Sequence, residues 1–220
     1  MTSHYLPAGT VYGTLLNFAD EFAAMAGQMA QPPYQAPPKA PVLFVKTANT
    51  WSASGASIPL AAHVTEVEVG ATIGMVIGPP RAGAPAHAPQ AGAYVLMNDL
   101  SLPHSSFFRP PVKFKCLDGF LGIGSLPVEA YLAGDPALFR LQVRINGDLC
   151  QAVDFSQMVR SAAQLLADVA AFMTLREGDV LMLGCAGSRP LARAGDHIEI
   201  SAPAHSAFGT LSNTLVAEAA

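Results

Sequence analysis

Cysteine is scarce in this chain, which has only Cys116, Cys150 and Cys185 in 220 residues. An odd number of widely spaced cysteines argues against a disulfide framework and against a zinc site built from closely spaced thiolates. We therefore expect a reducing, cytoplasmic setting.

Charge is also sparse. Charged residues make up 13% of the chain, the formal net charge is −4, and no basic cluster appears, so nucleic acid is excluded as a partner. No apolar run reaches the length of a membrane span and no signal peptide is visible, so we expect no membrane partner. Apolar residues account for 51% of the chain, more than the core of one small domain needs, and this predicts subunit contacts.

Apolar patterning predicts mostly strands. The runs that indicate strands are residues 9–18, 42–46, 71–78, 93–99 and 208–216. Asn146-Gly147, inside the alternating stretch 137–155, is typical of a two-residue hairpin turn. Helical spacing predicts helices over 20–30 and over 156–173, the second with Ser156 as its N-cap.

This element order predicts a mainly β chain with few helices (α+β), folded as a rolled mixed β-sheet barrel with a helix against it. Prolines in 31–41 forbid a helix and divide an N-terminal strand–helix extension, 1–40, from a main domain, 41–220. The polar stretch 47–57 is predicted to be a surface loop. Residues 100–125 are predicted to be a long loop that is either functional or an interface.

Three acidic residues raise the question of a metal site. Glu66 and Glu68 stand two apart just before the 71–78 strand, and Asp99 ends a later strand. Carboxylates in this order can hold a hard divalent cation through oxygen ligands. The same residues also fit a solvated strand edge.

Seven motifs, in one order along nearly the whole chain, resemble the fumarylacetoacetate hydrolase family. They are GTVYGTLLNFADEF, PPYQAPPKAPVLFVKTANT, GATIGMVIG, MNDLS, KCLDGFLGIG, EGDVLMLG and GTLSNTLV. The segments PPYQAPPK and SFFRPPVKFKCLDGF carry a narrower resemblance. They are similar to the N-terminal half, or separate first subunit, of the bifunctional decarboxylase/isomerases of 4-hydroxyphenylacetate (homoprotocatechuate) breakdown.

The family resemblance implies a fumarylacetoacetate hydrolase-like fold and Mg²⁺ or Mn²⁺ held by two glutamates and an aspartate. The metal would act as a Lewis acid on an oxo acid and stabilise an enolate. The family's glutamates precede the glycine that ends the strand, here Gly78, and correspond to Gly70 and Thr72. Glu66 and Glu68 lie four residues too early, roughly 13 Å along a strand. We therefore expect no metal or other cofactor here, and we expect both glutamates to be surface carboxylates.

Other family positions also differ. The histidine and glutamate of the family's dyad correspond to Glu21 and Ala24, its arginine to Pro103 and its threonine to Cys185. The retained residues are Lys46, Asn49, Asp99, Lys115, Asp118 and Gly119. The resemblance implies catalytic roles for Lys115 and Asp99. It implies substrate-binding roles for Lys46, Asn49, Thr72 and Asp118.

Each retained charge also has a structural alternative. Asp99 can cap the turn that follows it, which we favour over a metal role. Lys115 can pair with Asp99 or Asp118, or it can bind a substrate anion. Lys46 can be a solvated strand end or an anion contact.

Two functions remain open at this point. In the first, the chain is a subunit of a decarboxylase/isomerase for oxo-tricarboxylate and hydroxymuconate-type intermediates, with a small oxo acid as substrate. Lys115 would then polarise the substrate and Asp99 would orient it. In the second, the chain is a non-catalytic, metal-free partner that scaffolds a metal-bearing sister chain. Either function predicts a homo-oligomer or a heteromer with a second family subunit, and whether this chain is itself an enzyme stays open.

Overall fold

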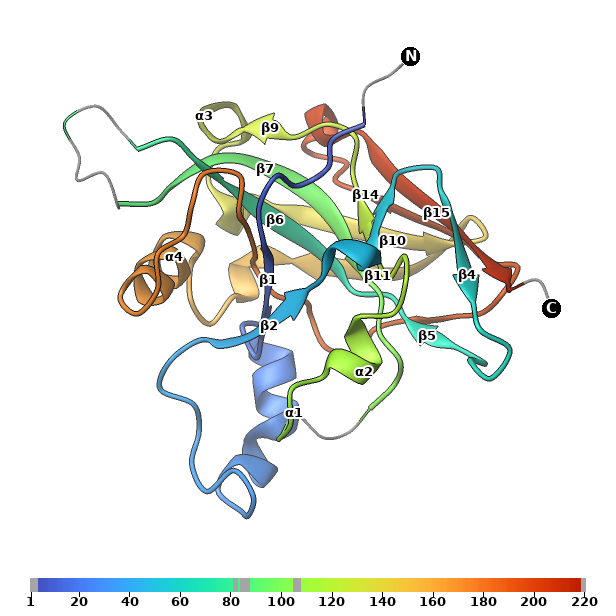
Figure 1. The fold of residues 1–220 in the computed structure, drawn as a ribbon, viewed down its shortest axis with the longest axis horizontal. Coiled ribbons are helices and arrows are strands. Elements are labelled where there is room, and N and C mark those ends of the chain that lie inside the picture. The colour runs from blue at the N-terminus through green and yellow to red at the C-terminus, as the bar shows by residue number, and fades with distance from the viewer. Residues whose placement is uncertain (1–3, 81–82, 84–87, 105–107, 219–220) are drawn as a thin grey trace.

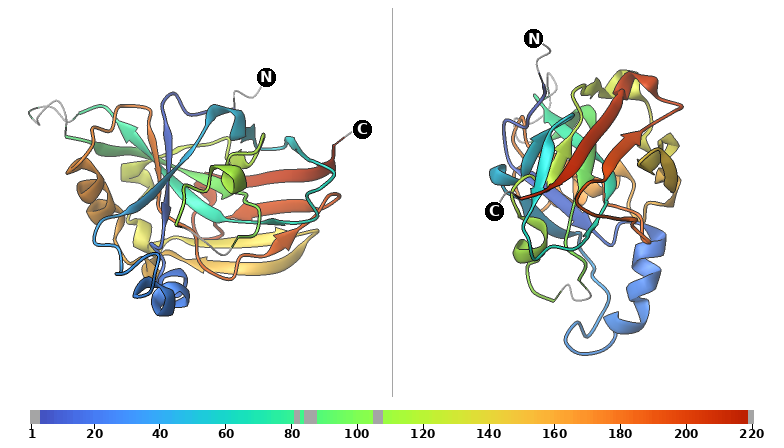
Figure 2. Two further views of the ribbon diagram at one scale, coloured as in Figure 1. Left: turned by 60° about the horizontal axis from the view of Figure 1, so that its bottom comes forward. Right: turned by 90° about the vertical axis from the view of Figure 1, so that its right-hand side faces the viewer.

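A large curled sheet forms one layer of the protein (Figures 1 and 2). The computed structural model describes residues 4–80, 83, 88–104 and 108–218. The large sheet has eight strands in the order β2-β1-β12-β6-β7-β8-β3, with β9 beside β7. These strands are β1 (Val11–Leu15), β2 (Val42–Lys46), β3 (Trp51–Ala53), β6 (Ala71–Gly78), β7 (Gln90–Asp99), β8 (Leu121–Ile123), β9 (Val128–Glu129) and β12 (Val180–Met182).

A second sheet of five strands packs against the first, in the order β11-β10-β14-β15-β4. Its strands are β4 (Ser57–Leu60), β10 (Arg140–Ile145), β11 (Asp148–Asp154), β14 (His197–Ser201) and β15 (Thr210–Ala217). A small pair, β5 (Val67–Glu68) with β13 (Leu191–Ala192), lies apart from both sheets. The pairs β1–β12, β3–β8 and β4–β15 are parallel, whereas the neighbours within β6–β7–β8 are antiparallel. The predicted mainly β, rolled mixed architecture is therefore confirmed.

Helices are short and peripheral. They are α1 (Ala19–Met29), α2 (Val112–Lys115), α3 (Ala130–Ala133) and α4 (Ala162–Ala170). The 20–30 helix prediction is confirmed, but the helix predicted over 156–173 begins at Ala162, with Ser161 as its N-cap. Asp154 explains the late start, because its Oδ1 accepts the Ser156 N–H and closes a 3₁₀ turn over Phe155–Gln157 instead.

Strand β7 shows why the apolar runs contain so little alternation. Tyr94 and Leu96 face the core between the two sheets, while Val95 and Met97 face a second core on the opposite side of the large sheet. A strand that is buried on both faces reads as a continuous apolar run. The hairpin prediction at Asn146-Gly147 is also confirmed, because both residues adopt positive φ angles, 54° and 90°, between β10 and β11.

Two predicted loops contain regular structure. Residues 47–57 form a 3₁₀ turn, strand β3 and the start of β4, so the surface-loop prediction is wrong there. Small polar residues are tolerated because β3 and β4 each lie at the end of a sheet. The segment 100–125 includes α2 and β8.

The predicted boundary at residue 40 cuts through the large sheet. Strand β1 lies inside it, between β2 and β12, with Val11 opposite both Lys46 and Val180. Helix α1 lies at one end of the molecule beyond that sheet (Figure 1). The 1–40 segment therefore supplies a strand that is integral to the layer carrying the candidate site.

The surface retains large apolar side chains. Leu126, Tyr131, Leu132 and Leu138 are each more than half exposed, and Tyr131 reaches 79%. This agrees with the excess of apolar residues noted in the sequence. Across the described ranges, no helix is long and apolar enough to cross a membrane.

Gly13 marks the tightest packing between β1 and β2, because a methyl group there would overlap the Phe44 ring. We expect Gly13→Ala to destabilise the fold by about 1–3 kcal/mol through overpacking. Gly27 provides the matched control, since it lies in α1 with nothing within 4 Å of an added Cβ. Gly27→Ala should stabilise by about 1 kcal/mol. Urea denaturation of both variants measures this, and equal effects would contradict the packing argument.

Candidate functional site

Asp99 lies buried between two lysines. It ends β7, and its Oδ1 lies 2.8 Å from Lys46 Nζ while its Oδ2 lies 2.6 Å from Lys115 Nζ. The side chains of both lysines are fully buried. Burial alone would raise the pKa of Asp99, but the charges of Lys115 and Lys46 outweigh burial and hold that pKa below its usual range. Asp99 is therefore an anion that is already neutralised within the protein.

Lys46 is an internal cross-link. Besides Asp99, its Nζ donates to the carbonyl oxygens of Leu100 at 2.8 Å, Lys115 at 2.6 Å and Phe120 at 2.7 Å. Burial lowers the pKa of Lys46 to about 8, although Asp99 opposes this shift. Three carbonyl acceptors need three N–H donors, so the ammonium form fits the site at neutral pH. Of the two alternatives for Lys46, the solvated strand end is wrong, because its side chain is fully buried.

Lys115 sits at the end of α2, with its ammonium group 4.5 Å from the centre of the Phe44 ring. Ser101 Oγ lies 3.5 Å from the same nitrogen. Of the two alternatives for its partner, the structure pairs Lys115 with Asp99 and not with Asp118.

The remaining predicted residues are placed elsewhere. Asn49 Nδ2 donates to Asp118 Oδ1 at 2.6 Å and to the Cys116 carbonyl at 3.1 Å, and both Asn49 and Asp118 are exposed. Thr72 is buried, and its hydroxyl donates to the Gly184 carbonyl at 2.5 Å. The structure thus brings together Lys46, Asp99 and Lys115, while Asn49–Asp118 and Thr72 form separate contacts.

A second charge network involves Arg189, which the sequence analysis missed. Its Nη2 lies 2.5 Å from Glu21 Oε1 and its Nη1 lies 3.4 Å from Glu68 Oε2. Glu21 Oε2 also accepts the Leu16 N–H at 2.6 Å. Burial raises the pKa of Glu21, while Arg189 and the Leu16 N–H act in the opposite direction. The sequence did contain a signal for this network. Glu21 shares the buried stripe of α1 with Met25, so its carboxylate requires a cationic partner, but the sequence does not say which cation that is.

Glu66 and Glu68 separate in the structure. Glu68 contacts Arg189 from β5, with its side chain 25% exposed. Glu66 pairs with Arg193, with Nη2 to Oε2 at 3.2 Å, near the surface. Surface placement is thus correct for Glu66, whereas Glu68 belongs to the Arg189 network.

The residues present do not fit a divalent metal. A Cβ at Gly70 would lie 2.6 Å from the Asp99 carbonyl and 3.0 Å from Cys185 Sγ, so no side chain has room there. Burial raises the pKa of Cys185 to about 12, which keeps it a thiol and not a thiolate ligand. Among the described residues, no three His, Cys, Asp or Glu side chains are placed to bind a metal ion.

Comparison with known proteins identifies the fold. A family model for the C-terminal domain of fumarylacetoacetate (FAA) hydrolase matches residues 10–216. The chain belongs to the fumarylacetoacetate hydrolase family. The 4-hydroxyphenylacetate degradation bifunctional isomerase/decarboxylase of Salmonella dublin is 36% identical over 212 residues, covering 96% of this chain and 48% of that protein. Its Escherichia coli counterpart is 34% identical over the same shares. The chain thus spans about half the length of these curated relatives.

Solved structures show the same family fold. An uncharacterized protein from Mycobacterium abscessus superimposes with a TM-score of 0.77 at 27% identity, covering 98% of this chain and 81% of that one. A 5-carboxymethyl-2-hydroxymuconate delta-isomerase from Mycobacterium smegmatis gives 0.74 at 25% identity, with the same coverage.

Removing the charge of Asp99 should be costly. Asp99→Asn leaves two buried ammonium groups without an anion, so we expect a loss of about 3–5 kcal/mol in unfolding free energy. Asp154→Asn is the matched control, because the Arg140–Asp154 pair is 45% and 42% exposed and should contribute at most about 1 kcal/mol. Chemical denaturation compares them, and a loss below 1 kcal/mol for Asp99→Asn would rule out the buried triad.

Arg189 and Glu21 should behave as one unit. Arg189→Met leaves the Glu21 carboxylate buried and unpaired, and we expect a loss of about 3 kcal/mol or more. Adding Glu21→Gln removes that charge and should recover part of the loss, giving a coupling energy of roughly 1 kcal/mol or more. A double-mutant cycle by urea denaturation measures this coupling, and additive losses would show that the two side chains act independently.

Proposed function

We propose that this chain is a subunit of an enzyme of the decarboxylase/isomerase type in 4-hydroxyphenylacetate catabolism. Within that assembly it would be a non-catalytic, metal-free partner of a metal-bearing sister chain. The substrates would be oxo-tricarboxylate and hydroxymuconate-type intermediates, and the compartment would be the cytoplasm. The similarity to the Salmonella dublin and Escherichia coli proteins supports the pathway. Assignment to their N-terminal half rests on the two narrower motifs and stays a prediction.

One observation carries the partner role. Every charged group at the family's chemical centre is already paired inside the protein: Asp99 with two lysines, and Arg189 with two glutamates. To chelate a metal or to polarise a keto oxygen, these groups would first have to exchange their present partners. Buried and paired charges instead hold strands and helices together. The exposed apolar side chains of Leu126, Tyr131, Leu132 and Leu138 agree with a chain that works in an assembly.

A second candidate, turnover by this chain itself, has one observation in its favour. A cavity of about 380 Å³ reaches Lys115, with Phe44 and Val112 in its apolar wall and Arg109 at its side. An oxo acid could place a carboxylate near Arg109 and its keto oxygen toward Lys115. Such a reaction would require Lys115 to leave Asp99, because their present separation is 2.6 Å.

Turnover of the oxo-tricarboxylate by the purified chain separates the two candidates. The partner role predicts no turnover with Mg²⁺ or with excess chelator, and activity on mixing with a family member that carries the two metal glutamates. Activity of the mixture should exceed that of the sister chain alone.

The other outcomes would contradict the partner role or the conclusion that these residues do not fit a metal. Turnover that survives chelator, and that is lost in Lys115→Met, would replace the partner role with metal-free catalysis. Turnover abolished by chelator would contradict the finding that these residues do not fit a metal. A monodisperse monomer that leaves the sister chain's activity unchanged would also exclude the partner role.

A further inference from the structure

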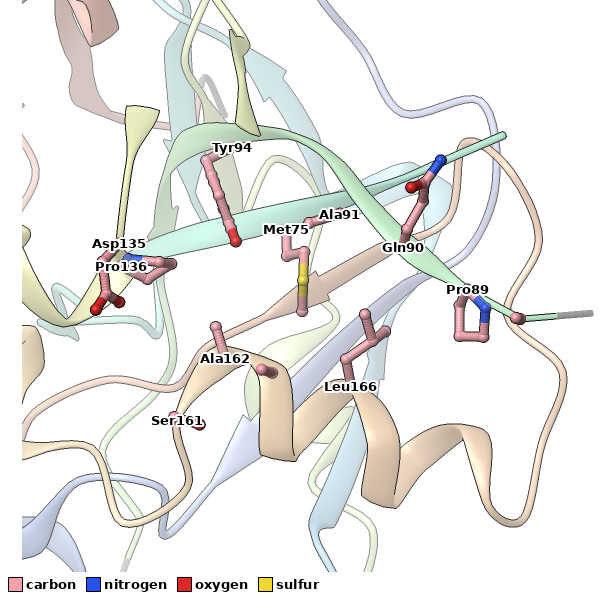
Figure 3. A pocket seen from close by; sticks show the side chains of 12 residues that line it. Met75, Pro89, Gln90, Ala91, Tyr94, Asp135, Pro136, Ser161, Ala162 and Leu166 are labelled. Carbon is pink, nitrogen blue, oxygen red and sulfur yellow. The ribbon is translucent and has the colours of Figure 1, made fainter. Parts of the chain in front are cut away.

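A second cavity lies away from both charge networks, between the β6–β7 ribbon and α4 (Figure 3). Its volume is about 550 Å³, within the range of small-molecule sites. Met75, Pro89 and Leu166 supply much of its apolar wall, with Met75 and Leu166 approaching from opposite sides. None of the charged residues of the two networks lines it.

Tyr94 presents an unused donor to this cavity. The residue is 6% exposed, and its hydroxyl points into the space between Met75 and Ala162 (Figure 3). Within the described part of the chain, that hydroxyl makes no hydrogen bond to another residue, and it remains accessible from the cavity. Burial first, and then the charge of Asp135, raise the pKa of Tyr94 to about 12, so the phenol keeps its proton at neutral pH.

Complementary polar groups lie at the same end. Asp135 Oδ1 accepts the Ala137 N–H at 3.0 Å, which leaves Oδ2 available among the described contacts. Ser161 caps α4 through its oxygen, and the first-turn N–H groups of Ala162 and Ala163 have no acceptor within the helix. The cavity therefore combines an apolar body with one edge that both donates and accepts.

We propose that this cavity binds a neutral aromatic alcohol of the phenol class. A hydroxyl group is the smallest function that can accept from Tyr94 and donate to Asp135 at once. An aromatic ring would pack between Leu166 and the thioether of Met75, a favourable sulfur–aromatic contact. Asp135 disfavours a carboxylate in its place, and the N-terminal end of α4 disfavours a cation.

This site shares no residue with the proposed partner role, so either can fail without the other. The test ligands are 4-methylphenol, toluene and 4-methylbenzoate, which differ at one ring position. They are titrated into the full chain while the Met75 methyl resonance, assigned with Met75→Leu, is followed by NMR. We expect 4-methylphenol to shift that resonance at millimolar or lower concentration and to bind roughly tenfold tighter than toluene.

Tyr94→Phe removes only the hydroxyl and should abolish the preference for 4-methylphenol over toluene. Tyr131→Phe, at an exposed position, is the matched control and should leave the preference unchanged. Leu166→Trp should fill the cavity and remove binding of both ligands, with retained folding checked by circular dichroism.

Three results would overturn the proposal. They are no Met75 shift with millimolar 4-methylphenol, equal preference in the native chain and in Tyr94→Phe, or tighter binding of 4-methylbenzoate than of 4-methylphenol.

Discussion

The buried triad of Lys46, Asp99 and Lys115 is the interaction on which the rest of the site depends. It joins the end of β7 to β2 and α2, and through the three carbonyl contacts of Lys46 it also fixes the turns after Asp99 and before β8. Charges so deeply buried persist only when each has a partner. Asp99 is committed to two cations, and the proposed metal-free role rests on this one constraint.

The Arg189 network also pairs buried charges that come from separate elements. The Arg189 guanidinium pairs with Glu21 from α1 and with Glu68 from β5. Glu21 also accepts the N–H of Leu16, whose backbone has a positive φ of 61°. Gly70 adds to this close packing, because the backbone of Asp99 and the thiol of Cys185 occupy the space that a side chain at position 70 would need. The family fold is retained, and the charged groups of both networks are packed into its interior.

Much of the fold could be predicted from the sequence because strand patterns, the Asn146-Gly147 turn and the α1 stripe are local signals. The start of α4 could not, since Asp154 and Ser161 compete as caps and only tertiary context selects between them. At the site, the resemblance predicts from the sequence alone that Gly70 and Thr72 replace the family's metal glutamates. The burial of Lys46 and the role of Arg189 could not be predicted, because they depend on which distant segments meet. Lys46 bonds the Leu100 carbonyl 54 positions away and Arg189 bonds Glu21 168 positions away, and contacts over such separations leave no periodic trace in a sequence.

Mn²⁺ binding tests whether the centre of this chain is closed to a divalent cation. Electron paramagnetic resonance of Mn²⁺ titrated with the purified chain reports the free ion. We expect the free-ion signal to stay at its protein-free amplitude when the chain is equimolar with Mn²⁺. Loss of that signal with one-to-one stoichiometry, reversed in Asp99→Asn, would contradict the account and return Asp99 to the role of a metal ligand.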